Sequence, residues 1–195
     1  DGLEKAYKLS IKGMKFNVTS QGTFCYAREA GKPAAGGAVG LTAVGTLCMQ
    51  LLGGSSDPDC RKGISIVDTF TPTFEVTNIG ASPQYYYYYA TQVKFFEGGG
   101  KWQAWNKMMK PVYVNSQKKL SGEYTYKGKD YDIGYWENKD GATVRPFMDT
   151  CLVALQLMVY YRNLPTTSIN VTEVEVEKEI SANQKGDIAV DAGNL

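Results

Sequence analysis

The chain has 195 residues, 43% hydrophobic and 21% charged, a balance typical of a globular protein with a substantial core. Its 21 basic and 20 acidic side chains leave a net charge of +1, which argues against a broad electrostatic surface for nucleic acid or an anionic membrane. The complete absence of histidine excludes zinc sites that need imidazole, nucleophiles activated by histidine, and histidine acid–base catalysis.

The N-terminal stretch has the pattern of a surface helix. Its apolar residues recur at helical spacing, with lysines and a glutamate between them: Leu3, Tyr7, Ile11 and Met14. This spacing predicts one buried stripe along an otherwise solvated helix. Residues 19–37 then contain Gln21-Gly22 and a segment rich in Gly, Pro and Ala, which predicts a loop.

Two further helices are predicted before residue 70. Residues 39–52 carry no charge and are apolar on nearly every face, so we expect a helix buried all round that ends at Gly53-Gly54. Asp57-Pro58 is an N-cap followed by proline at the first helical position, and it opens a short third helix. Cys48 and Cys60 either form a disulfide or remain buried thiols. Residues 71–80 predict a loop of extended character.

Residues 82–117 predict a helical hairpin. Ser82-Pro83 is a second cap with proline, and Gly98-Gly99-Gly100 ends the helix that it opens. The next helix runs from Trp102 to Gln117, and the short glycine turn makes the two helices antiparallel. Pro111 lies inside this second helix and predicts a kink or a break near Lys107.

The remaining sequence alternates between polar and apolar segments. Residues 120–144 form a long polar stretch with many aromatic side chains, interpreted as an excursion between helices. Pro146 opens a sixth helix that is again apolar on nearly all faces and is ended by Pro165. Residues 166–195 fit no helical period and predict either one or two surface strands or a linker.

The helix pattern as a whole favours an all-α fold with repeated hairpins. The second and sixth helices are charge-poor, whereas the first, third and fifth carry lysines and an apolar stripe. Alternation of inner buried and outer amphipathic helices predicts a partial α/α toroid of about three helical hairpins over residues 1–165. A polar, possibly β-containing tail follows over residues 166–195. An ordinary helical bundle is the alternative.

Three stretches resemble the terpenoid cyclase and protein prenyltransferase superfamily, specifically bacterial proteins with prenyltransferase/squalene-oxidase repeats. These stretches are Gly40–Gly54, Tyr85–Pro111 and Asp149–Pro165. The family's turn motif, a Gln followed by Gly and an aromatic residue, is similar to Gln21-Gly22 with Tyr26 and to Gln117 with Gly134 and Trp136. The resemblance implies an α/α toroid.

The activities that the resemblance would imply lack their residues here. In squalene-type cyclases the motif Asp-x-Asp-Asp-Thr-Ala supplies the acid that protonates the alkene, and Asp149-Thr150 match its last Asp and its Thr. Met148 stands at the position of the proton donor, and a thioether cannot protonate an alkene. Protein prenyltransferases use zinc held by Asp, Cys and His, and this chain has no His. We therefore expect no catalytic residue, no metal and no cofactor.

The sequence thus predicts a non-catalytic binding or interaction domain. The candidate binding residues at the mouth of the inner surface are Tyr85, Tyr86, Tyr89, Trp136, Phe147, Asp149 and Thr150. An acidic residue in a first helical turn also stabilises the helix N-terminus, so Asp149 has a purely structural explanation as well.

Two other functions stay open at this point. One is an isoprenoid-handling enzyme. The other is a carbohydrate-active α/α protein that uses carboxylates among Glu123, Asp130, Asp132 and Glu137, which a solvated loop also explains. The partner is an apolar ligand or a protein, with no nucleic acid and no integral membrane segment. The chain begins with Asp1 rather than methionine, which indicates either a mature form or an engineered fragment. An exported bacterial location, periplasmic or extracellular, is favoured over the cytoplasm.

Overall fold

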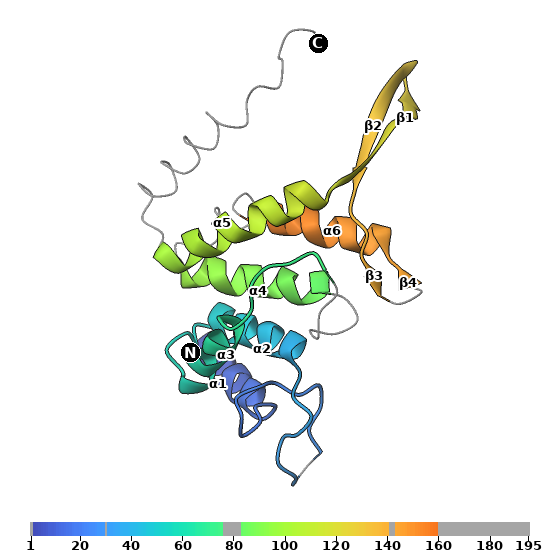
Figure 1. Cartoon of the computed structure of the whole chain (residues 1–195). Coiled ribbons are helices and arrows are strands. Elements are labelled where there is room, and N and C mark those ends of the chain that lie inside the picture. Colours follow the sequence, from blue (N-terminus) through green and yellow to red (C-terminus); the bar gives the residue numbers. More distant parts are fainter. Residues whose placement is uncertain (1, 30, 76–82, 141–142, 160–195) are drawn as a thin grey trace.

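The computed structural model describes residues 2–29, 31–75, 83–140 and 143–159, and this part of the protein is mostly helical (Figure 1). Its helices are α1 (Gly2–Lys15), α2 (Val39–Leu51), α3 (Pro58–Val67), α4 (Pro83–Glu97), α5 (Gly99–Ser116) and α6 (Pro146–Leu157). Its strands are β1 (Lys118–Tyr126), β2 (Lys129–Tyr135), β3 (Lys139–Asp140) and β4 (Thr143–Val144). The predicted starts at Pro58, Pro83 and Pro146 are confirmed. Ser82 and the predicted strands of 166–195 lie outside the described residues.

The even-numbered helices contact one another in series. α2 packs against α4, and α4 packs against α6, while α1 and α3 lie on α2 and α5 lies on α4. Figure 1 shows α1, α2 and α3 grouped at the N-terminal end, with α4, α5 and α6 forming a second group. The contact between α2 and α4 therefore joins the two groups.

α2 is buried along most of its length, as predicted. Seven of its residues are buried. Two glycines, one in α2 and one in α3, allow neighbouring side chains to come close to it. A Cβ at Gly45 would overlap the Phe24 ring, and a Cβ at Gly63 of α3 would overlap the Thr46 side chain. Neither position has room for a larger residue, so these glycines set the distance between α2 and its neighbours.

α1 and α6 are less buried than their patterns predict. Ile11 and Met14 pack against a small core of Phe24, Met49 and Cys60, but Leu3 is 64% exposed. The predicted stripe of α1 is therefore buried only at its C-terminal end, and Tyr7 is exposed as well. In α6, Asp149, Val153 and Gln156 are buried, whereas Phe147 is exposed, so this helix is covered on one side only.

Local chemistry explains where the confirmed helices begin. The Asp57 carboxylate accepts a hydrogen bond from the Asp59 N–H at 2.9 Å and so caps α3. Gly98 and Gly99 have φ angles of 71° and 51° between α4 and α5, a conformation that glycine adopts without steric cost. α5 begins at Gly99, three residues before the predicted Trp102.

Of the kink or break predicted near Lys107, the break is wrong, because α5 continues through Pro111. Proline removes one N–H and leaves the Lys107 carbonyl without its helical donor. Both Pro111 and Lys107 lie on the exposed side of α5, where water can bond to that carbonyl. The helix therefore tolerates proline at this position.

Residues 118–135 form a β-hairpin, so the predictions of an all-α fold and of an irregular excursion are corrected. β1 and β2 pair antiparallel from Lys118↔Tyr135 to Tyr126↔Lys129, with a bulge between Leu120 and Tyr124. The two-residue turn is Lys127-Gly128, with φ angles of 51° and 74°. Two positive φ angles match the twist of the flanking strands, which is why this turn closes a hairpin.

The main core lies between α2, α4, α5 and α6 and is rich in aromatic rings. Tyr86, Tyr87 and Trp105 pack in sequence, with ring centroids 5.1 Å and 6.2 Å apart. A buried polar network crosses this core. Gln156 Oε1 accepts hydrogen bonds from Tyr113 Oη at 2.8 Å and from Thr91 Oγ1 at 3.1 Å. The network thus ties α6 to α4 and α5.

All four cysteines are free, so Cys48 and Cys60 form no disulfide. Cys25 and Cys60 are buried, and Cys60 Sγ lies 3.8 Å from the Thr46 carbonyl oxygen, to which it donates. Cys151 is exposed on α6. None of the described helices combines the length and the apolar content needed to span a bilayer.

Candidate functional site

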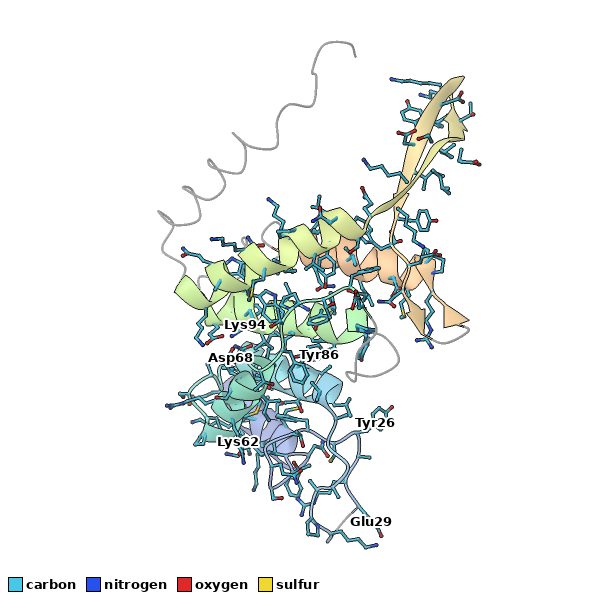
Figure 2. The ribbon with its side chains drawn as sticks, viewed as in Figure 1. Tyr26, Glu29, Lys62, Asp68, Tyr86 and Lys94 are labelled. Atoms are coloured by element: carbon cyan, nitrogen blue, oxygen red, sulfur yellow. The ribbon has the colours of Figure 1, made fainter. Side chains whose placement is uncertain are left out.

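The predicted tyrosines of α4 occupy different environments. Tyr86 is 1% exposed and packs against Phe70 at a centroid distance of 5.3 Å, which places it in the core (Figure 2). Tyr85 is 43% exposed, and its ring lies 5.0 Å from the half-buried ring of Tyr89. Of these three side chains, Tyr85 and Tyr89 therefore reach the surface.

Three of the predicted candidates lie together, although they are distant in the sequence: Trp136, directly after β2, and Asp149 and Thr150, in the first turns of α6. Thr150 Oγ1 accepts from the Trp136 N–H at 2.9 Å and lies 3.1 Å from the Trp136 carbonyl oxygen, to which it donates. The Trp136 indole N–H donates to the Tyr113 carbonyl at 2.8 Å. Phe147, one turn away on the same helix, is exposed.

The Asp149 carboxylate bonds to the same segment that follows β2. It is 2% exposed and accepts from the Asn138 N–H at 2.7 Å. Burial raises the pKa of Asp149, although the Asn138 hydrogen bond and the charge of Arg145 act in the opposite direction. Asp149 and Thr150 thus hold the backbone of 136–138 on the N-terminal turn of α6, with their polar atoms bonded inside the protein.

The exposed surface next to residues 136–138 is one face of the β1–β2 hairpin. The register places six large apolar side chains on the same side, of which Tyr135 is half-buried. The five exposed ones form what is here named the aromatic face: Leu120, Tyr124, Tyr126, Tyr131 and Ile133. Each is between 37% and 52% exposed. Three of its rings, those of Tyr124, Tyr126 and Tyr131, line a shallow hollow of about 390 Å³.

Lysines surround the aromatic face. Lys129 Nζ lies 5.5 Å from the centroid of the Tyr131 ring, and Lys127 Nζ lies 5.3 Å from that of Tyr126. Lys118 stands on the same side near the base of the hairpin, where it pairs with Glu137. Cations above tyrosine rings are attracted by the negative face of the ring. The hollow is therefore apolar at its floor and positive at its edge.

Two of the four carboxylates considered for sugar cleavage, Asp130 and Asp132, bond within the hairpin. Asp130 and Asp132 alternate with Tyr131, so they lie on the opposite side of the hairpin from the aromatic face. Asp130 accepts from Thr125 Oγ1 at 2.5 Å, and Asp132 accepts from the Gly122 N–H at 3.2 Å. A glycosidase needs two carboxylates facing one substrate across a groove, and these two stabilise the hairpin itself.

A second polar cluster lies between α3 and α4. Lys94, almost fully buried, pairs with Asp68 and Glu97, and Lys101 pairs with Asp68 at 2.8 Å (Figure 2). Burial alone would raise the pKa of Asp68, but its hydrogen bonds to Lys101 and Lys94 outweigh burial and lower it. A groove of about 210 Å³ runs beside this cluster. Because two positive charges meet two negative ones, the cluster is self-neutralising and structural.

The aromatic face is absent from the predictions above, although the sequence carries a signal for it. Tyr124 and Tyr126 alternate with polar residues, as do Tyr131 and Ile133, and a two-residue segment containing glycine separates the two runs. Alternation with period two on both sides of such a segment is the pattern of a hairpin. The high content of charged residues concealed this pattern.

Within the parts of the chain that the structure describes, no three acidic or cysteine side chains gather closely enough to hold a metal ion. Comparisons with protein-family models, with curated proteins and with solved structures give no match for this chain.

Proposed function

We propose that this protein is a binding domain without catalytic function of its own, built on a partial α/α-toroid scaffold, whose aromatic face binds an extended polypeptide segment. One observation carries the proposal. Five large apolar side chains on one side of a two-stranded sheet are each between 37% and 52% exposed. An isolated hairpin is marginally stable in water, and large exposed apolar patches mark binding surfaces.

The scaffold is supported by the helix contacts and by the sequence resemblance. The series α2, α4, α6 with α3 and α5 outside it is the order of inner and outer helices in an α/α solenoid. The Gln117 amide lies against Gly134, close in sequence to Trp136, as expected for the turn motif of prenyltransferase/squalene-oxidase repeats. A domain of this superfamily in which methionine replaces the acid and no histidine exists is more suited to binding than to catalysis.

The shape of the aromatic face favours a polypeptide over a small apolar molecule. A small ligand needs a walled pocket that removes most of its surface from water, and the lining of the hollow on the hairpin, among the described residues, is three tyrosines. An extended segment can instead lie along the hairpin and place alternate side chains on the rings. The lysines at the edge favour a segment of negative net charge.

A labelled peptide of alternating valine and glutamate tests this proposal by fluorescence anisotropy. We expect binding that weakens as salt is added, because lysines contribute to it. Replacing Tyr124 and Tyr131 with serine should weaken binding by more than about tenfold, since two ring contacts are lost. Tyr26→Ser is the matched control, because Tyr26 is 88% exposed and lies outside the hairpin.

Two results would overturn the proposal. One is equal affinity of the wild-type chain and the Tyr124→Ser/Tyr131→Ser variant for the peptide. The other is equal binding of a peptide in which lysine replaces glutamate, which would show that charge plays no part.

A further inference from the structure

We propose that the aromatic face is occupied, when no partner is bound, by the chain's own acidic segment Thr172–Ile180. This inference rests on the proposed function and names the first occupant of its site. The segment lies outside the described residues, so its sequence, its charge and its attachment point carry the argument.

The segment has the composition that the aromatic face selects. The even-numbered positions from 174 to 180 are Val174, Val176, Lys178 and Ile180, which would share one side of an extended chain, and the odd-numbered positions from 173 to 179 are all glutamate. Residues 166–195 contain six acidic and two basic side chains, while residues 1–165 contain 14 acidic and 19 basic ones. The apolar side chains match the tyrosine rings, and the glutamates match the lysines around them.

The lysines of the hairpin lie where they can attract an acidic segment bound to the aromatic face. Lys118 and Lys129 rise from the same side of the hairpin as the tyrosines, and Lys127 occupies the turn beyond Tyr126. Asp130 and Asp132 point to the other side, so they do not repel an acidic segment on the aromatic face. Removing apolar surface from water supplies the affinity, and opposite charge fixes the register.

The attachment point lets the segment reach the face of its own molecule. α6 begins beside the base of the hairpin and has 12 residues, so its C-terminal end is about 18 Å away. The chain from Val159 to Thr172 can extend to about 43 Å, enough to return along α6 and reach the tyrosines. A tether of this length gives an effective concentration in the millimolar range, well above that of a second molecule in dilute solution.

Zero-length carbodiimide cross-linking of the full chain, read by mass spectrometry, tests the occupant directly. We expect amide links between Lys118, Lys127 or Lys129 and the glutamates of Thr172–Ile180. Mixing isotopically heavy and light chains distinguishes links within one molecule from links between two. Links that include heavy–light pairs at the frequency of random pairing would overturn the inference, and so would an absence of links between this segment and the hairpin.

The valine–glutamate peptide supplies a second measurement. Replacing Val174, Val176 and Ile180 with serine leaves every charge in place but removes the apolar contacts of the segment. Because the tethered competitor is lost, the peptide should bind this variant about tenfold more tightly than the wild-type chain. Ile188→Ser/Val190→Ser is the control, since both residues lie beyond the segment, and it should leave the affinity unchanged.

The outcomes separate the two proposals. Peptide binding of equal strength to the wild-type chain and to the triple serine variant would refute the occupant and leave the proposed function standing. No peptide binding to either protein would refute the proposed function itself.

Discussion

Single side chains decide how closely the helices of the N-terminal group approach. Gly63 of α3 faces Thr46 of α2, and Gly45 of α2 faces the ring of Phe24. Neither contact is visible in a hydrophobicity pattern, because glycine carries no apolar side chain to count. The distance between these helices therefore depends on residues that look neutral in the sequence.

Gly63→Ala should destabilise the protein by about 1–3 kcal/mol, because the new methyl group would overlap the buried Thr46 side chain. Gly13→Ala in α1 is the matched control. Nothing lies within 4 Å of its added Cβ, so the gain in helix propensity should stabilise the protein by about 0.5–1 kcal/mol. Urea denaturation of both variants measures the difference. Equal stabilities would show that α2 and α3 are not held at this distance in solution.

Two carboxylates should contribute to stability with opposite pH dependence. The pKa of Asp68 is lowered in the folded protein, so its contribution is complete above the ordinary pKa of about 3.9 and is lost as pH falls through the lower folded pKa. The pKa of Asp149 is raised, mainly by burial, so its ionised form is disfavoured in the folded protein. Its contribution is most favourable at low pH and declines as pH rises from about 3.9 through the raised folded pKa.

Denaturation of the wild-type chain, Asp68→Asn and Asp149→Asn at several pH values between about 3 and 7 measures both effects. The stability of wild type relative to Asp68→Asn should rise with pH, and that relative to Asp149→Asn should fall. Two slopes of the same sign would contradict the burial of Asp149 or the pairing of Asp68 with its lysines.

At the scale of elements, the β1–β2 hairpin is held to the helices at its base. Trp136 bonds to Tyr113 of α5 through its indole and to Thr150 of α6 through its backbone, and Asn138 bonds to Asp149. The rest of the hairpin projects away from the helices (Figure 1). These few contacts therefore fix the direction in which the aromatic face points.

Thr150→Val should loosen this attachment, because it leaves the Trp136 N–H and carbonyl without their partner at a cost of about 1–3 kcal/mol. Hydrogen exchange should accelerate at Trp136 and along β1 and β2, with little change in α2. Thr69→Val is the control: its exposed hydroxyl donates only to the Ile66 carbonyl, and its loss should cost less than about 0.5 kcal/mol. Unchanged exchange at Trp136 in Thr150→Val would disprove the role of Thr150.

The elements that could be predicted from the sequence are those with local signals. Asp57-Pro58 and Gly98-Gly99 fix a helix start and a turn through their own backbone chemistry, which no distant residue alters. The hairpin depends instead on pairing between two strands. The bulge near Gly122 shifts that pairing, so β1 does not keep a strict alternation of side chains along its whole length. The role of Asp149 depends on Asn138, which lies 11 residues away in the sequence, so only the folded chain shows that its carboxylate is already used.

At the scale of the whole molecule, the contact between α2 and α4 joins the two groups of helices. Ala43 of α2 is fully buried in the same cluster as Ala90 of α4, and Gln50 Nε2 donates to the Val93 carbonyl at 3.2 Å. Among the described residues, Gln50 Oε1 and the Tyr86 hydroxyl make no hydrogen bond. Buried polar atoms without partners lower stability, so these two atoms offset part of the stabilisation that the contact between α2 and α4 provides.

Ala43→Leu should separate the unfolding of the two groups, because overfilling this junction costs about 1–3 kcal/mol and pushes α2 from α4. The second group of helices and the segment directly after β2 contain all three tryptophans: Trp102, Trp105 and Trp136. Their fluorescence should change at higher denaturant concentration than the circular dichroism, whereas the two transitions coincide in wild type. Ala6→Leu on the exposed side of α1 is the control. Coincident transitions in Ala43→Leu would show that the groups unfold together.

The four free cysteines differ in exposure, and Cys151 is the one whose thiol is exposed to solvent. Burial raises the pKa of the Cys60 thiol to about 11 and also raises that of Cys48, so both react slowly. Cys151 stands in water on α6. Cys151 is therefore the thiol that we expect a water-soluble alkylating reagent to modify first in the folded protein.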